Sequence, residues 1–232
     1  MAGIRLDSLE NHKTTMQHFW IDDDYREAFS ELEVTNLSSL MGLAAGQCLS
    51  MHRRGSTFAL TLPDGRRVFL KRDHFVFKKD CWQELLRGER MRPKCLREAW
   101  VYERLSKEGI LVPQVVGTAW AKGLVFPAYG AIIMCPLPGI PLSQACLQEP
   151  SRKNELAEAA CQALADLQQR GYDWPDSKAE HFFVQPDGSF GFLDMERLTF
   201  HWRPPSKSRC QKQKKRLLGS LELALQTQHT RN

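Results

Sequence analysis

Apolar and polar residues alternate over two stretches that flank a Pro-Asp-Gly sequence at positions 63–65. The alternating apolar residues are Phe58, Leu60, Leu62, Val68 and Leu70. A period of two is typical of half-buried strands, and Pro-Asp-Gly is typical of the turn that joins them. We therefore predict a β-hairpin, in which Lys71 closes the second strand on the face opposite Leu70.

Two longer segments, 95–109 and 151–171, carry their apolar residues at helical spacing. The stripe of the first consists of Leu96, Trp100, Val101 and Leu105. The stripe of the second consists of Leu156, Ala160, Ala163, Leu164 and Leu167. Each segment ends at a glycine, which is a common residue just beyond the last helical turn. We predict two helices here, and two further strands over 115–123 and 129–135.

The stretch "DSKAEHFFVQPDGSFGFLD", residues 176–194, holds two short apolar runs separated by a second Pro-Asp-Gly turn. This pattern predicts another hairpin. Asp176 lies in the loop before its first strand, and Asp194 directly follows its second strand. Because a hairpin enters and leaves at the same end, we expect both acids and His181 to lie near that end.

The order of these elements predicts an α+β protein with two lobes. Residues 1–40 are acidic and are interpreted as an irregular or short-helical leader. Residues 41–136 hold most of the strands and one helix. Residues 137–232 are mainly helical, with one hairpin, and they follow a boundary that is rich in Pro and Gly near residue 136.

Composition excludes several classes of protein. Hydrophobic residues make up 42% of the chain, yet no apolar run is long enough for a transmembrane helix. The first residues lack the apolar core of a signal peptide, so we expect a cytoplasmic protein. The seven cysteines are odd in number and form no Cys-x-x-Cys pair, which argues against a zinc site or a disulfide framework.

The net charge of +5 is unevenly distributed. Residues 203–216 contain seven Lys or Arg and no acid. Such a run is most often a solvated segment or helix face, and the alternative is a contact with anionic lipid or a polyanionic substrate. Nucleic acid is a weaker candidate, because no base-reading motif accompanies the basic residues.

Five residues occur in the order and on the predicted elements that phosphoryl transfer needs. Protein kinases use a Lys on a strand, a Glu on the next helix, a catalytic Asp, a metal ligand five residues later and a second Asp after a hairpin. The matching residues are Lys71, Glu98, Asp176, His181 and Asp194. Each one alone has an ordinary structural explanation; together they favour a kinase-like function.

The sequence "WPDSKAEHFFV…GSFGFLDMERL" resembles the lipopolysaccharide kinase (Kdo/WaaP) family, and especially its InaA-like branch. The stretches "HRRGS", "VFLKRDHF" and "CLREAWVYERLSKEGILVP" resemble the first lobe of the same branch. The resemblance covers roughly residues 50 to 198. It implies a protein-kinase-like fold, with residues 41–136 as a β-rich N-lobe and residues 137–232 as a shortened helical C-lobe with a basic tail.

The resemblance also implies a role for each matching residue. Asp176 would be the catalytic base, and His181 and Asp194 would bind Mg²⁺. Lys71 would contact the phosphates of ATP and pair with Glu98. Gly55 would lie in the loop over the nucleotide. The implied reaction transfers the γ-phosphate of ATP to a sugar hydroxyl of the lipopolysaccharide inner core, a heptose or Kdo. The basic tail is the basis for expecting a peripheral contact at the cytoplasmic face of the inner membrane.

Two alternatives stay open. The loop expected over the nucleotide has one glycine, Gly55, where protein kinases have three, and the second lobe is short. Both features favour a non-catalytic, kinase-like binding protein. A kinase of another small molecule or of a protein is the other alternative, because the acceptor is chosen by surfaces that the sequence does not reveal. The sequence also gives no indication of the oligomeric state.

Overall fold

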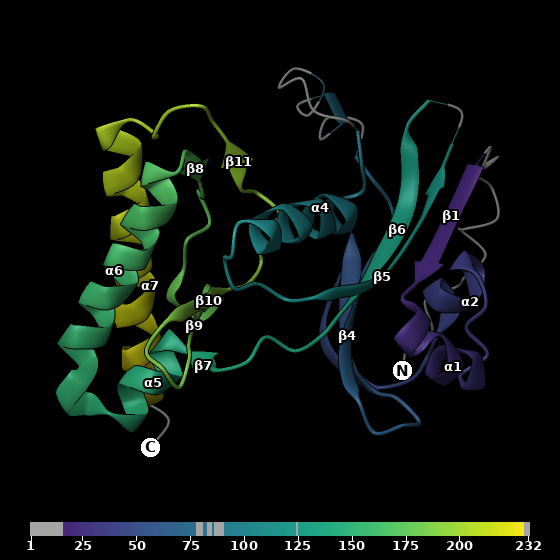
Figure 1. The fold of residues 1–232 in the computed structure, drawn as a ribbon, viewed down its shortest axis with the longest axis horizontal. Helices are drawn as coiled ribbons and strands as arrows, with labels where there is room; N and C mark the ends of the chain where they lie inside the picture. The colour runs from purple at the N-terminus through teal and green to yellow at the C-terminus, as the bar shows by residue number, and fades with distance from the viewer. Residues whose placement is uncertain (1–15, 78–80, 83–84, 86–90, 124, 230–232) are drawn as a thin grey trace. The chain divides into compact units, whose positions relative to one another are not determined.

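The computed structural model describes residues 16–77, 81–82, 85, 91–123 and 125–229. The chain forms two compact units (Figure 1). The first comprises Met1–Trp100 and Gln114–Pro136, and the second comprises Val101–Pro113 and Leu137–Asn232. The predicted boundaries of the leader and the two lobes stay predictions. The sequence also predicts a basic, partly helical insert over 74–94, of which residues 78–80, 83–84 and 86–90 lie outside the described residues.

The first unit is built on a six-stranded antiparallel sheet with the strand order β1-β5-β6-β4-β3-β2. Its strands are β1 (Met16–Ile21), β2 (Gln47–His52), β3 (Gly55–Thr61), β4 (Arg67–Asp73), β5 (Val115–Lys122) and β6 (Pro127–Met134). The predicted hairpin is confirmed as β3 and β4, in which Leu60 pairs with Val68 and Phe58 with Leu70. The two strands predicted over 115–123 and 129–135 are confirmed as β5 and β6.

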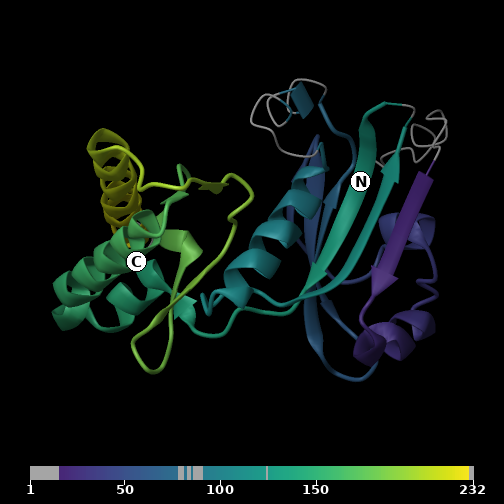
Figure 2. The same cartoon turned by 45° about the horizontal axis from the view of Figure 1, so that its top comes forward.

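Helices α1 (Asp23–Glu31) and α2 (Leu37–Gly42) cover one face of this sheet, and α4 (Lys94–Lys107) begins over the other (Figures 1 and 2). The alternation along β4 explains this division. Val68 and Leu70 are fully buried in the core shared with α1 and α2. Lys71 and Asp73 have the opposite parity and therefore face α4.

The acidic N-terminal segment contains two short helices, one of the two forms expected from its sequence, and it also contributes a strand to the sheet. Strand β1 pairs with β5 along its whole length. Phe29 and Leu40, from α1 and α2, are completely buried in the core of the first unit. Side-chain caps explain why two such short helices form: Asp22 accepts a hydrogen bond from the backbone of α1, and Asn36 makes a capping box with Ser39 at α2.

Arg72 fastens α2 to the sheet. It is buried, and its guanidinium donates hydrogen bonds to the carbonyl oxygens of Met41, at 2.8 Å, and Leu43. Burial lowers the pKa of Arg72 to about 10, so the side chain stays protonated at neutral pH. The end of α2 therefore supplies backbone acceptors to a buried cation.

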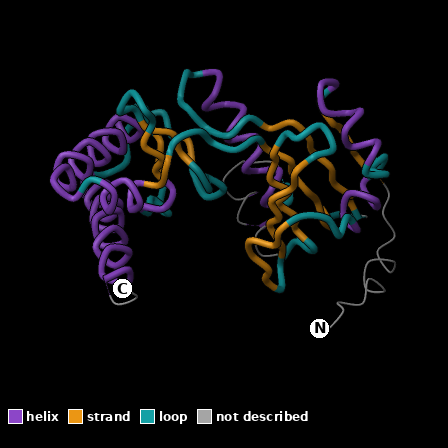
Figure 3. The backbone as a smooth tube through the Cα atoms, turned by 90° about the horizontal axis from the view of Figure 1, so that it is seen from below, coloured by secondary structure: helices purple, strands orange, loops and turns teal. Residues whose placement is uncertain are grey.

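The second unit is mainly helical, and its helices gather on one side of its short strands (Figure 3). Its helices are α5 (Leu142–Gln148), η2 (Pro150–Arg152), α6 (Lys153–Gln169), η3 (Ala179–His181) and α7 (Lys207–His229). Its strands are β7 (Ile140–Pro141), β8 (Tyr172–Asp173), β9 (Phe182–Val184), β10 (Phe190–Phe192) and β11 (Thr199–Phe200). The second predicted hairpin is confirmed as β9 and β10, with Phe182 opposite Phe192.

Both predicted helices exist, as α4 and α6, and Gly109 and Gly171 adopt the positive φ that follows a helix end. The buried stripe of α6 matches the prediction except that Ala163 is half-buried. The predicted stripe of α4 is confirmed at Val101 and Leu105, which are fully buried, whereas Leu96 and Trp100 are only half-buried. Cys95, Glu98 and Tyr102 are also buried. The buried face of α4 therefore contains a carboxylate.

None of the described helices has an apolar stretch long enough to cross a membrane. No disulfide joins the seven cysteines, all of which lie within the described residues.

Candidate active site

The candidate residues divide between the two units. Lys71, Glu98 and Gly55 lie in the first unit. Asp176, His181 and Asp194 lie in the second. Each group has its own network of contacts.

Lys71 and Glu98 form an ion pair in which the Nζ atom lies 2.6 Å from the Oε2 atom. The Glu98 side chain is only 2% exposed and that of Lys71 is 21% exposed. A carboxylate buried to this degree needs a cationic or hydrogen-bonding partner, because desolvation penalises its charged form. The pairing predicted from the sequence is therefore present, and it fixes the direction of the lysine side chain.

The first turn of α4 is anchored to the strand that carries Lys71. The backbone N–H of Cys95 donates a hydrogen bond to the Asp73 carboxylate at 2.7 Å. Burial, together with the nearby Asp73, raises the pKa of the Cys95 thiol well above its usual range. Cys95 is thus a neutral packing residue, and the Asp73 contact holds α4 in the register that brings Glu98 to Lys71.

Gly55 begins β3 directly after the Arg53–Arg54 turn that joins it to β2. A Cβ atom at this position would collide with the backbone carbonyl of Arg72 on β4. The close approach that requires a glycine here is therefore between two strands. Arg53 and Arg54 are exposed at the tip of the turn, and the Arg54 guanidinium lies 4.0 Å from the centre of the Phe77 ring.

In the second unit, Asp176 lies in the segment that runs from the end of β8 through η3, residues 173–181. We call this segment the catalytic loop, after the role proposed for it below. One oxygen of its carboxylate, Oδ1, lies 2.5 Å from the guanidinium of Arg216 on α7. The Asp176 side chain is 19% exposed. One carboxylate oxygen is thus held by a cation, and the loop still reaches solvent at this residue.

His181 connects Asp176 to Asp194. Its Nδ1 atom lies 2.9 Å from the backbone carbonyl oxygen of Asp176, and its Nε2 atom lies 3.6 Å from Oδ2 of Asp194. Because a carbonyl oxygen can only accept, Nδ1 must carry the proton, which leaves a lone pair on Nε2 in the neutral ring. Histidines that bind metals usually have this arrangement, with the other ring nitrogen donating to a carbonyl.

Aromatic residues hold the His181 ring in place. Trp174 is completely buried, and its ring stacks against both His181 and Phe182, with interplanar angles of 28° and 29°. Phe192 packs edge-on against the same indole. Trp174 thus packs directly against the histidine ring, and the hairpin β9–β10 supports Trp174 through Phe182 and Phe192.

Asp194 adopts a left-handed backbone conformation with a φ of 56°. Its N–H donates a hydrogen bond to the hydroxyl of Tyr102, at 2.9 Å. Asp tolerates this conformation better than most residues, and a non-glycine residue held in it is often found at a functional site. A carboxylate oxygen of Asp194 lies within 4.8 Å of a carboxylate oxygen of Glu196.

Two of these contacts were not predicted from the sequence. Tyr102 lies four residues after Glu98, so the helical period that places Glu98 on the buried face places Tyr102 there too. Arg216 is one of seven basic residues in the tail, and nothing in the sequence separates it from its neighbours.

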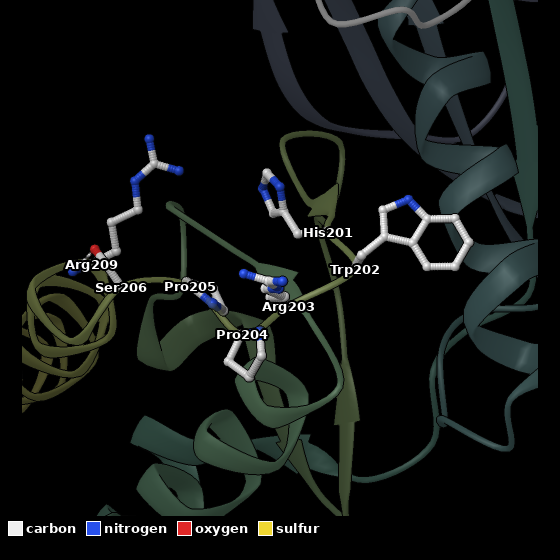
Figure 4. A pocket seen from close by; sticks show the side chains of 7 residues that line it. All are labelled: His201, Trp202, Arg203, Pro204, Pro205, Ser206 and Arg209. Carbon is white, nitrogen blue, oxygen red and sulfur yellow. Dashed lines mark hydrogen bonds between the residues drawn. The ribbon is translucent and has the colours of Figure 1, made fainter.

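A surface hollow of about 440 Å³ lies beside the start of α7. It is lined by His201, Trp202, Arg203, Pro204, Pro205, Ser206 and Arg209 (Figure 4). In Figure 4 the side chains of His201, Trp202 and Arg209 point in different directions. Trp202 is fully exposed. The hollow is therefore an open, cationic and aromatic surface, and it differs in character from the loop around Asp176.

Comparison with known proteins identifies the family and the fold of the chain. A model of the lipopolysaccharide kinase (Kdo/WaaP) family matches residues 50–231. A solved structure described as WaaP in complex with acyl carrier protein has a similar fold, with a TM-score of 0.57 and 17% sequence identity over 93% of this chain and 89% of that chain. This similarity confirms the predicted α+β, protein-kinase-like fold. No curated protein sequence matches the chain, and the assignment to the InaA-like branch stays a prediction.

Proposed function

The chain belongs to the lipopolysaccharide kinase (Kdo/WaaP) family, and on that premise we propose that it transfers the γ-phosphate of ATP to a sugar hydroxyl of the lipopolysaccharide inner core, on a heptose or Kdo. Membership of the family supports a role as a sugar kinase. The observation that carries the finer proposal is the position of His181, which contacts the backbone of Asp176 and faces the carboxylate of Asp194.

We propose that Asp176 orients the acceptor hydroxyl and accepts its proton. Its Oδ1 atom is held by Arg216, which leaves Oδ2 to meet the hydroxyl. A carboxylate that is positioned in this way acts as a general base. In the first unit, Lys71 places a cation against the phosphates, and Glu98 fixes its direction. Preorganised charge of this kind stabilises the charge that develops during transfer.

The donor set of the second unit suits Mg²⁺, which prefers carboxylate oxygens. Asp194 and Glu196 supply two carboxylates, and one oxygen of each lies within 4.8 Å of the other. His181 is the third proposed ligand, because the lone pair of its Nε2 atom faces Asp194, although imidazole nitrogen is a donor that Mg²⁺ uses less readily. When bound, the ion would neutralise charge on the phosphate oxygens.

Binding of nucleotide separates a kinase from a non-catalytic, kinase-like protein. We expect Mg·ATP to raise the midpoint of thermal unfolding, since a ligand at 100 times its Kd stabilises the folded state by about 2.7 kcal/mol. Labelled ATP and a panel of acceptors then test the reaction: core lipopolysaccharide, small sugars and a protein mixture. Label in the core sugars is the expected result. Transfer of label to another acceptor would contradict lipopolysaccharide as the substrate. An unchanged unfolding midpoint in the presence of Mg·ATP would favour a non-catalytic binding protein.

We also propose a cytoplasmic protein that contacts the inner membrane peripherally through the surface around Trp202. Trp202 is fully exposed, and Arg203 and Lys207 beside it are exposed cations. Tryptophan favours the boundary between lipid and water, and each nearby cation adds about 1 kcal/mol of attraction to an anionic leaflet. The acceptor of the proposed reaction is itself anchored in a membrane, so this contact would bring the two together.

Vesicle sedimentation tests the membrane contact. We expect the protein to bind vesicles that contain anionic lipid at low salt and to be released as salt rises. Trp202→Ala and Arg203→Ala should each weaken binding, with a loss of about fivefold for the removed cation. Trp20→Ala, at a half-exposed tryptophan of the first unit, is the matched control. Equal binding to neutral vesicles, or none to either, would contradict the proposal.

A further inference from the structure

Four side chains on α7 contact the catalytic loop at successive turns of the helix. They are Arg209, Gln213, Arg216 and Ser220. Their spacing of four, three and four residues places them on one face of the helix. The order of the contacts along α7 follows the order of the residues that they meet in the loop, from Asp173 to Ala179. The helix therefore runs alongside the loop and holds it at several points.

The first contacts fix the entrance to the loop. The carboxylate of Asp173 is almost completely buried, and it accepts hydrogen bonds from Arg209, at 2.6 Å, and from the side-chain amide of Gln213. The oxygen of the same Gln213 amide accepts a hydrogen bond from Gln168 of α6, at 2.8 Å. Gln213 thus has both ends of its amide engaged, and its buried side chain connects α6, α7 and the loop.

The middle of the loop is held twice. The hydroxyl of Ser177, which is fully buried, donates a hydrogen bond to the backbone carbonyl of Gln213 at 3.2 Å. One turn further along α7, Arg216 pairs with the carboxylate of Asp176 at 2.5 Å. The first contact is made by the residue that follows the proposed catalytic base in the chain. The contact of Arg216 is made to the base itself.

The end of the loop is held by Ser220. Its hydroxyl oxygen accepts a hydrogen bond from the backbone N–H of Ala179, at 2.8 Å. Ala179 begins the short helix η3, which ends at His181. On the side of α7 that faces the rest of the unit, Leu217 and Leu221 are buried. Packing of these leucines therefore fixes the position of α7, and the loop residues that α7 contacts are held in place as a result.

From this arrangement we infer that α7 fixes the conformation of the catalytic loop, a role that we call the splint. We infer also that Arg216 is a positioning residue for Asp176. Arg216 holds one carboxylate oxygen so that the other is presented to the acceptor hydroxyl. Hydrogen bonds within the loop are few and local, such as Lys178 N–H to Asp176 O, at 2.9 Å, so much of the orientation of the Asp176 side chain comes from α7. The inference rests on the proposed function for the role of Asp176, and on geometry alone for the splint.

Kinetics of Arg216→Ala test the positioning role. We expect kcat to fall by about 100-fold, the loss that a displacement of roughly 1 Å causes at a reacting group, with little change in the KM for ATP. Lys215→Ala is the matched control, because it removes the same charge from the neighbouring, exposed position of α7. Arg216→Lys should recover part of the rate, since it restores the cation. Equal kcat values for Arg216→Ala and Lys215→Ala would overturn the positioning role.

Hydrogen–deuterium exchange tests the splint without any need for activity. In the full-length protein, Arg216→Ala and Ser220→Ala should increase amide exchange over residues 176–181, whereas Lys215→Ala should leave it unchanged. If the wild-type protein transfers no phosphate but these exchange differences appear, the splint stands and the proposed function fails. If exchange over the loop is the same in all variants, the splint is wrong whatever the activity.

Discussion

Asp176→Asn is expected to reduce phosphate transfer by about 10²- to 10⁴-fold, the contribution that a positioned general base makes to a reaction rate. An amide cannot take the proton of the acceptor hydroxyl, but it has the shape of the carboxylate and its oxygen can still accept a hydrogen bond from Arg216. The loop should therefore keep its structure while it loses the base. The measurement is the rate of transfer from labelled ATP to the acceptor that the screen identifies.

Asp187→Asn is the matched control for this substitution. Asp187 is an exposed acid in the turn of the hairpin that follows the catalytic loop, and it caps the backbone N–H of Ser189 at 2.9 Å. Its conversion to Asn changes the same charge in the same segment and should leave the rate unchanged. Both variants should unfold at the temperature of the wild-type protein. Full activity in Asp176→Asn would remove Asp176 from the mechanism.

Lys71→Met is expected to lower the free energy of unfolding by about 3 kcal/mol and to abolish measurable transfer. The stability effect follows from burial, because the substitution removes the cation that lies 2.6 Å from the almost fully buried Glu98 carboxylate. The double variant Lys71→Met/Glu98→Gln should recover much of the stability, since it also removes the buried charge. It should recover none of the activity, because the cation that meets the phosphates is still absent.

Lys107→Met provides the comparison for stability. Lys107 pairs with Glu103 at 2.7 Å on the same helix, α4, but both side chains are largely exposed. An exposed pair contributes little, so we expect a change of no more than about 0.5 kcal/mol. Chemical denaturation of the four proteins measures these differences. The account of the buried pair would be wrong if the double variant were no more stable than Lys71→Met.

The hairpins show how much local sequence can determine. Each Pro-Asp-Gly turn is flanked by apolar residues that point to one face, and both the turn preference and the alternation act between residues that are close in sequence. The same is true of the glycines that end α4 and α6. These signals placed Lys71 on a strand and Asp194 directly after one, which is why the order of the kinase-like residues could be recognised.

The face of α4 shows where local information ends. Of the predicted stripe, the structure buries Val101 and Leu105 fully but leaves Leu96 and Trp100 half-exposed. It buries Glu98 and Tyr102 beside them. A carboxylate becomes acceptable in a buried face only because Lys71 lies opposite, and the two residues are 27 positions apart. The N-terminal segment is a second case in which a distant residue decides the structure. Its acidic composition suggests a leader, but β1 pairs with β5, which lies about one hundred residues later in the chain.

Local sequence was therefore enough to predict the two hairpins, the helices α4 and α6, and the candidate residues Lys71, Glu98, Asp176, His181 and Asp194. Which of these residues meet, and what holds them, depends on the packing of elements that are distant in the chain. Arg216 reaches Asp176 across 40 positions, and Tyr102 reaches Asp194 across 92. The physical reason is that turn formation and amphipathic periodicity depend on neighbours in the chain, whereas a hydrogen bond between distant residues depends on how packed elements bring their backbones together. For Asp176, the local pattern places a carboxylate before the hairpin, and Arg216 of α7 holds that carboxylate.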